Sequence, residues 1–260
     1  MIKLENTEVV GWEHAIRGMR NPMNSWEKSD SAIVNDGGLE NSDIIVEKKG
    51  NEYFVVGEKD QKLATGLRNA GTDHRKFMRM IAVYLDITAP LYWWKEFDTY
   101  KVGTVANSCS TMHKIHDKEF TLDDFSHEHL IYDWVGDNNE AIWYKDPPEN
   151  SPIKCQLMFS PLDALRITIG VLNANREAYL KTKNKKYWWQ MIQLLPSSYN
   201  QRRTVMLNYE VLANIYKSRK NHKLDEWRTF CDWIENLPYS ELITGQKKRQ
   251  NGCMKGEKNA

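Results

Sequence analysis

Residues 80–112 have the sequence MIAVYLDITAPLYWWKEFDTYKVGTVANSCSTM, which carries the clearest secondary-structure pattern in the chain. The first nine residues, Met80 to Thr88, are mostly apolar or β-branched, and such a run predicts a strand in the middle of a sheet. Ala89-Pro90 ends this run, and proline is favoured in the first turn of a helix. We therefore expect a helix over residues 91–100 and, around Gly103, an ordered loop.

The segments on the N-terminal side of this stretch predict a small antiparallel sheet. Asp43 to Glu47 and Tyr53 to Val56 are two β-branched runs on either side of a Gly50-Asn51 turn, which is typical of a hairpin. Residues 59–69 have apolar side chains at helical spacing, and Gly71 lies where the end of a helix is expected.

The C-terminal third is predicted to be helical. Ser160-Pro161 precedes a long apolar segment, which is the pattern of a capped helix start. Further helices are expected over residues 185–195, which Pro196 ends, and over residues 201–219 and 225–236. Together these elements predict an α+β fold, with a small antiparallel sheet flanked by helices and a helical C-terminal half.

These elements are consistent with one core, so we expect a single domain over residues 1–243. Residues 244–260 are rich in Lys, Gly and Asn and have no apolar face. We expect this segment to be a disordered basic tail.

The charge balance, the apolar runs and the cysteine spacing argue against several classes of protein. The 36 basic and 35 acidic residues leave a net charge of +1, which argues against a protein that grips nucleic acid by global charge. No run approaches the roughly 18 apolar residues of a membrane helix, and the first residues are not those of a signal peptide. We therefore expect a cytoplasmic protein without a membrane partner. The four cysteines form no CxxC pair, which excludes a zinc ribbon or a thioredoxin-type motif.

Two histidine pairs suggest a metal site by spacing alone. His113 and His116 would share a helix face, and His127 and His129 would share a strand face. Solvated histidines are commoner, so we predict no metal, although the sequence does not decide whether these four bind one.

The aromatic residues have two interpretations. Tyr92-Trp93-Trp94 and Tyr187-Trp188-Trp189 are clusters that could fill a core or an oligomer interface, and they could also form a platform for a flat ring. We expect a homo-oligomer, because such helices expose more apolar surface than a monomer usually tolerates.

The stretch from Asp73 to Met112 resembles the signature region of the flavin-dependent thymidylate synthases, the ThyX family. In that family a turn with a histidine leads into a strand that ends in Ala-Pro, as His74 and Ala89-Pro90 do here. A helix and an Arg-His-Arg triplet follow in the family. The triplet falls on Thr99, Tyr100 and Lys101.

The loop after this triplet also resembles the family loop. Thr104 stands for its first serine and, with one inserted residue, Asn107 and Ser110 match its asparagine and second serine. Ser108 replaces a glutamate of the family, and Glu96 replaces a helix glutamine that lies near dUMP.

A second set of residues resembles the C-terminal part of the family. Leu195-Pro196 is followed by Asn208, Asn214 and Arg219 at the family's distances, and then by Trp227 where a tryptophan is usual. In the family the two asparagines face the flavin and the arginine contacts the uracil of dUMP. With residues 201–219 as one helix, Asn208 and Asn214 would lie about 120° apart around its axis and flank a cleft.

The resemblance implies a ThyX-like enzyme that methylates dUMP to dTMP or carries out a related pyrimidine reaction. It implies FAD as cofactor, NADPH and methylenetetrahydrofolate as co-substrates, a uracil nucleotide or nucleoside as ligand, and a homotetramer. Arg219 would be the catalytic residue and would also bind substrate. The implied cofactor-binding residues are His74, Thr99, Tyr100, Lys101, Thr104, Asn208 and Asn214. The other implied substrate-binding residues are Glu96, Asn107, Ser108 and Ser110.

The departures from the family pattern remove positive charge. Thr99-Tyr100-Lys101 keeps one cation of the triplet, and Glu96 and Glu210 replace a glutamine and an arginine. Each lost charge-assisted bond would weaken phosphate binding by about 1.5–3 kcal/mol. An alternative is therefore a catalytically degenerate ThyX-fold protein that binds flavin or nucleotide in a regulatory role. A further alternative is an enzyme for an uncharged base or nucleoside.

Overall fold

The computed structural model describes residues 2–35, 38, 45–131 and 160–246. Most of the predicted tail, residues 247–260, lies outside the described residues, as do Asp43 and Ile44 of the predicted hairpin. Within the described part of the chain, no helix is both long enough and apolar enough to cross a membrane.

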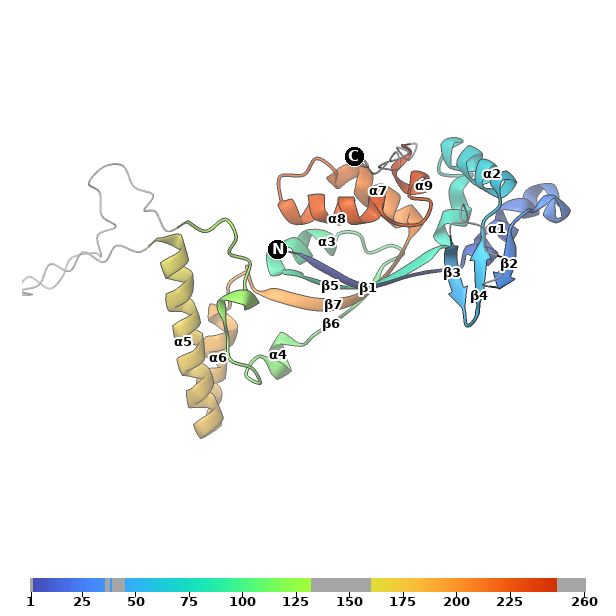
Figure 1. Cartoon of the computed structure of the whole chain (residues 1–260). Helices are drawn as coiled ribbons and strands as arrows, with labels where there is room; N and C mark the ends of the chain where they lie inside the picture. The colour runs from blue at the N-terminus through green and yellow to red at the C-terminus, as the bar shows by residue number, and fades with distance from the viewer. Residues whose placement is uncertain (1, 36–37, 39–44, 132–159, 247–260) are drawn as a thin grey trace, which may run out of the picture. The chain divides into compact units, whose positions relative to one another are not determined.

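Helices and strands alternate in the first half of the chain, whereas helices dominate the second half (Figure 1). The strands are β1 (Lys3–Val10), β2 (Ala32–Asn35), β3 (Ile45–Lys49), β4 (Glu52–Val55), β5 (Ala82–Pro90), β6 (Val105–Ser108) and β7 (Asn200–Asn208). The α-helices are α1 (Trp12–Arg20), α2 (Glu58–Asn69), α3 (Leu91–Phe97), α4 (Thr111–Lys114), α5 (Pro161–Thr182), α6 (Lys185–Leu194), α7 (Tyr209–Arg219), α8 (Asp225–Glu235) and α9 (Glu241–Thr244). The 3-10 helices are η1 (Asn21–Met23), η2 (Trp26–Lys28), η4 (Arg75–Arg79) and η5 (Leu122–Asp124).

The strands form two small sheets, and the predicted α+β class is confirmed. One sheet has the order β1-β5-β7-β6, and the other has the antiparallel order β2-β4-β3. In β5 the alternate residues Val83, Leu85 and Ile87 are at most 1% exposed, whereas Tyr84 is 43% exposed. This alternation gives the strand one core face and one open face, as expected for a sheet covered on one side.

Contacts divide the chain into two compact units. The α5–α6 unit comprises Thr88–Phe97 and Ser108–Arg203, and the α7–α8 unit comprises Ile2–Ile87, Asp98–Asn107 and Thr204–Ala260. A single domain over residues 1–243 stays a prediction.

The α7–α8 unit has a core built around α7. This helix packs against α8, α9 and η4. Helices α7, α8 and α9 lie together in Figure 1. Trp12 contributes from the start of α1, with its ring centroid 5.4 Å from Tyr209 and 5.5 Å from Tyr239. Gly11 sets the start of α1, because its φ is +91° and a Cβ there would collide with the carbonyl oxygen of Met80.

The α5–α6 unit has its own apolar cluster. Helices α5 and α6 pack side by side (Figure 1). Their Leu165, Leu172 and Met191 meet Phe120 and Phe125 in one buried cluster. Ser160 caps α5 by accepting a hydrogen bond from the backbone N–H of Asp163, as the sequence predicts.

Most predicted elements are confirmed, with shifted ends. The hairpin is β3 and β4, the helix over 59–69 is α2, and those over 185–195 and 225–236 are α6 and α8. The helix predicted over 91–100 ends at Phe97, and the strand predicted over 80–88 is β5.

The prediction of one helix over residues 201–219 is wrong in its first half. Residues Asn200–Asn208 form β7, and the helix α7 begins only at Tyr209. Gln201, Val205 and Leu207 are buried while Arg202 and Thr204 are exposed. This alternation is the period of a strand rather than of a helix. Asn208 is therefore not on the helix that carries Asn214.

Candidate ligand-binding site

Arg219 lies in an aromatic setting in the α7–α8 unit. Its guanidinium carbon is 4.8 Å from the ring centroid of Trp227 and 5.7 Å from that of Tyr100. Its Nε donates a hydrogen bond of 2.9 Å to the Tyr100 hydroxyl. Trp227 is fully buried, so the guanidinium rests on a rigid surface. The structure thus brings together three residues that the sequence singles out, and it holds the arginine in one orientation.

A second polar group lies where η4 meets α7. Arg75 Nε is 2.8 Å from Glu210 Oε2, and its terminal nitrogen donates to Glu210 Oε1 at 3.0 Å. The same terminal nitrogen donates to Asn214 Oδ1 at 3.5 Å. Asn214 is exposed. His74 is also exposed and lies directly before Arg75, at the start of η4. Glu210, which stands where the family has an arginine, is therefore paired with Arg75.

The loop between α3 and β6 carries the other predicted cofactor residues of this unit. Gly103 has φ +78°, and a Cβ there would lie 3.0 Å from Asn208 Nδ2. Asn208 is the residue before α7, and its Oδ1 accepts a hydrogen bond of 3.0 Å from the backbone N–H of Val211. The side-chain oxygen of Asn208 therefore caps the helix, and its side-chain nitrogen faces the loop.

Thr104 has a hydroxyl that needs a partner. Its Oγ1 is buried, and no described residue makes a hydrogen bond with it. A buried hydroxyl without a partner is unfavourable by about 1–3 kcal/mol. Thr99 and Lys101, nearby in the same loop, are exposed.

The predicted substrate residues are divided between the two units. Asn107 is exposed on β6 in the α7–α8 unit. Glu96 is half-buried on α3 and Ser108 is exposed at the end of β6, both in the α5–α6 unit. Ser110, also in that unit, accepts a hydrogen bond of 3.0 Å from the backbone N–H of His113 and so caps α4.

Two of the four histidines of the metal hypothesis have other contacts. The ring of His116 lies 4.9 Å from that of Tyr179, and His127 Nδ1 is 2.8 Å from the carbonyl oxygen of Phe125. Within the part of the chain that the structure describes, no three His, Cys, Asp or Glu side chains are close enough to hold a metal ion.

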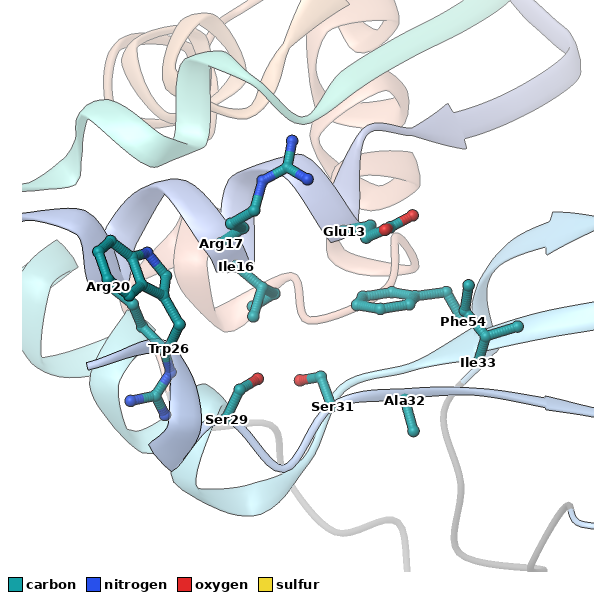
Figure 2. Close-up of a pocket in the computed structure, with 10 residues that line it drawn as sticks. All are labelled: Glu13, Ile16, Arg17, Arg20, Trp26, Ser29, Ser31, Ala32, Ile33 and Phe54. Atoms are coloured by element: carbon teal, nitrogen blue, oxygen red, sulfur yellow. The ribbon is translucent and has the colours of Figure 1, made fainter. Parts of the chain in front are cut away.

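Figure 2 shows a separate cleft of about 240 Å³ between α1 and the β2-β4-β3 sheet. Ile16 and Phe54 point into it, and the hydroxyls of Ser29 and Ser31 face one another at its floor. Both hydroxyls donate to the buried carboxylate of Asp60, at 2.6 and 2.7 Å. The two serine hydroxyls are thus already bonded to Asp60. The residues that line this cleft include none of the predicted site residues.

Comparisons with known proteins concern the fold. Two crystal structures of Helicobacter pylori thymidylate synthase X (ThyX) with FAD and dUMP align over 94% of this chain and 98% of their own. Their TM-scores are 0.58 and 0.56, at 13% and 14% sequence identity. The chain has a ThyX-like fold.

A further solved structure, the UMP/dUMP methylase PolB from Streptomyces cacaoi with 5-Br dUMP, aligns over 90% of this chain and 88% of its own, with a TM-score of 0.47 and 11% identity. No protein-family model and no curated protein sequence matches the chain. The similarity to ThyX therefore lies in the backbone, and the function of this chain is argued from its own side chains.

Sequence reasoning missed Arg75, whose partner Glu210 is 135 residues away. A buried acidic side chain in the first turn of a helix indicates that a basic side chain lies nearby. Only the fold shows which basic residue this is.

Proposed function

We propose that this chain is a ThyX-like flavin-dependent enzyme that acts on a uracil nucleotide. The observation that carries the proposal is the fixed Arg219, stacked on Trp227 and bonded to Tyr100, within a ThyX-like fold. A guanidinium held in this way can donate to a uracil carbonyl without losing further side-chain freedom.

The residues of the α7–α8 unit fit a flavin by their chemistry. Thr104 offers a buried hydroxyl that lacks a partner among the described residues, and Asn214 offers an exposed amide. Gly103 lets the loop approach Asn208 closely. Amides and hydroxyls can both donate and accept, which suits the polar edge of an isoalloxazine ring. His74, Thr99, Tyr100 and Lys101 complete the proposed cofactor set.

When bound, FAD would supply the hydride, with NADPH as the source of electrons and methylenetetrahydrofolate as the source of the one-carbon unit. The protein's own residues bind, orient and polarise. Arg219 withdraws electron density from the pyrimidine through its carbonyl, and Tyr100 keeps the guanidinium in place. Glu96, Asn107, Ser108 and Ser110 are proposed to contact substrate.

The charge balance near α7 favours retention of nucleotide binding. The Arg75–Glu210 pair is neutral overall, so Glu210 does not present an isolated negative charge to a phosphate. Exposed Lys101 is the proposed phosphate contact. Assembly into a homotetramer is a further part of the proposal.

The second candidate is a catalytically degenerate flavin- or nucleotide-binding protein with a regulatory role. The observation that favours it is the loss of a basic residue, because the family has an arginine where Glu210 stands and Arg75 is engaged with that glutamate. A protein of this kind would bind FAD and dUMP but would not turn them over.

We expect the purified chain to bind FAD, and we expect Thr104→Val to weaken FAD binding by about fivefold to tenfold. Valine keeps the shape of threonine but removes the hydroxyl that would bond to the cofactor. The same change should stabilise the FAD-free protein slightly, because it removes an unsatisfied buried group. Titration by flavin fluorescence measures affinity, and thermal denaturation without FAD measures stability.

Thr168→Val on α5 is the matched control, because the Thr168 hydroxyl donates to the carbonyl oxygen of Ala164 outside the proposed site. This control should leave FAD affinity unchanged. If the parent binds no FAD, the proposed function is wrong. If the parent binds FAD and Thr104→Val binds it with the same affinity, Thr104 is not part of the site.

A further inference from the structure

The ion pair of Arg75 and Glu210 is largely buried. Their side chains are 16% and 10% exposed. The terminal nitrogen of Arg75 donates a hydrogen bond of 3.0 Å to Glu210 Oε1, and Arg75 Nε lies 2.8 Å from Glu210 Oε2 as a charge contact without hydrogen-bond geometry. A charge-assisted hydrogen bond beside a close charge contact restricts the positions that the guanidinium can take. Arg75 is therefore held on η4 by the first turn of α7.

Arg75 also determines which way the amide of Asn214 faces. A guanidinium can only donate, so the Asn214 atom 3.5 Å from its terminal nitrogen is the amide oxygen. Glu210 and Asn214 are four residues apart on α7 and so lie on the same helix face. With its oxygen toward Arg75, the exposed Asn214 directs its NH2 group to the other side.

We infer that Arg75 and Glu210 are positioning residues, which act through Asn214 to present an amide NH2 donor to the ligand. This inference rests on the proposed function and deepens it. The ligand group opposite Asn214 is then a hydrogen-bond acceptor, such as a carbonyl oxygen or an unprotonated ring nitrogen of a flavin. An unconstrained asparagine would present a donor or an acceptor equally well.

The alternative is that the three residues only brace η4 against α7. Asn214→Asp separates the two roles. Aspartate keeps the shape and accepts from Arg75 more strongly, because its oxygens are charged, but it has no donor. The brace would be at least as strong as before, whereas the ligand would lose its donor and face a negative charge.

The experiment measures FAD affinity and thermal stability of the full chain in parallel. We expect Asn214→Asp to weaken FAD binding by about tenfold or more while leaving the melting temperature of the FAD-free protein unchanged or higher. The absorption band of any bound flavin should also shift, because a charge replaces a donor beside it. Asn175→Asp on α5 adds the same charge outside the site and should leave FAD affinity unchanged.

A second variant tests the two positioning residues directly. The double replacement Arg75→Met and Glu210→Met exchanges a buried ion pair for apolar side chains, which is often neutral for stability. Without Arg75, the Asn214 amide is no longer held, so we expect FAD affinity to fall about threefold to tenfold in a folded protein. The exposed pair of Lys114 and Asp117, replaced in the same way, is the control.

The titrations distinguish a failure of the proposed function from a failure of this inference. A parent that binds no FAD overturns the proposed function and this inference with it. If the parent binds FAD but Asn214→Asp, or the folded double variant, binds it with unchanged affinity and an unchanged spectrum, the inference alone is wrong. The three residues then only brace η4 against α7.

Discussion

Replacing Arg219 with alanine is expected to weaken dUMP binding to the FAD-loaded protein by about 100-fold or more. The substitution removes the proposed charge-assisted bonds to the pyrimidine, each about 1.5–3 kcal/mol, and leaves the hydroxyl of Tyr100 without its donor. Calorimetric titration with dUMP measures the loss. Deoxyuridine should lose a similar factor, because Arg219 is proposed to bind the base rather than the phosphate.

Two conservative variants serve as graded controls for Arg219. Arg219→Lys keeps the charge but loses the planar stacking on Trp227 and the bond from Nε, and we expect about a tenfold loss. Tyr100→Phe keeps the ring but removes the acceptor, and we expect about a threefold to tenfold loss. If Arg219→Ala bound dUMP within about threefold of the parent, Arg219 would not be the residue that holds the pyrimidine.

Replacing Asp60 with alanine is expected to lower the free energy of unfolding by about 3–5 kcal/mol. Asp60 is fully buried, and its Oδ1 accepts a 2.6 Å hydrogen bond from Arg20 Nε. Its Oδ2 accepts from the hydroxyls of Ser29 and Ser31 and from the backbone N–H groups of Asp30 and Ser31. The variant leaves the charge of Arg20 buried and unpaired. Urea denaturation followed by circular dichroism measures the change.

The stability that Asp60 contributes should depend on pH. Burial raises the pKa of its carboxyl. Hydrogen bonds from Ser29, Ser31 and Arg20, together with the charge of Arg20, lower the pKa by more than burial raises it, so the net pKa is below the ordinary value. The stabilisation is therefore complete above the unfolded pKa of about 3.9 and is lost as pH falls through the folded pKa.

Asp117→Asn, which breaks an exposed pair with Lys114, is the control for Asp60 and should leave the free energy of unfolding close to that of the parent. A loss below about 1 kcal/mol for Asp60→Ala at neutral pH would show that the network around Asp60 does not hold α1 to α2.

The fold could be predicted where local signals were strong. Ser160 before Pro161 marked the start of α5, and the apolar run after Met80 marked β5. The strand β7 was missed because Arg202 and Arg203 interrupt its apolar pattern. The sequence therefore predicted one helix over residues 201–219. The strand β1 was missed because only one face of KLENTEVV could be apolar, and most of its residues are exposed.

The elements that carry the candidate residues were predicted only in part. The resemblance to the family singled out Asn208, Asn214 and Arg219, but the sequence placed Asn208 on a helix that begins only at Tyr209. The sequence showed that Glu210 stands in place of a family arginine, but it did not show that Arg75 pairs with it. Contacts between residues far apart in the sequence, such as Arg75 with Glu210 or Arg20 with Asp60, are set by the tertiary fold and leave no local pattern.

The most direct measurement is the visible absorption spectrum of the FAD-loaded parent during titration with dUMP. We predict that the protein retains flavin through gel filtration and that dUMP shifts the flavin band in a saturable way. With Arg219→Ala, flavin should be retained but the shift by dUMP should be lost. A parent that retains no flavin, or whose flavin spectrum is unchanged by dUMP at saturating concentration, would contradict a shared site for cofactor and uracil nucleotide.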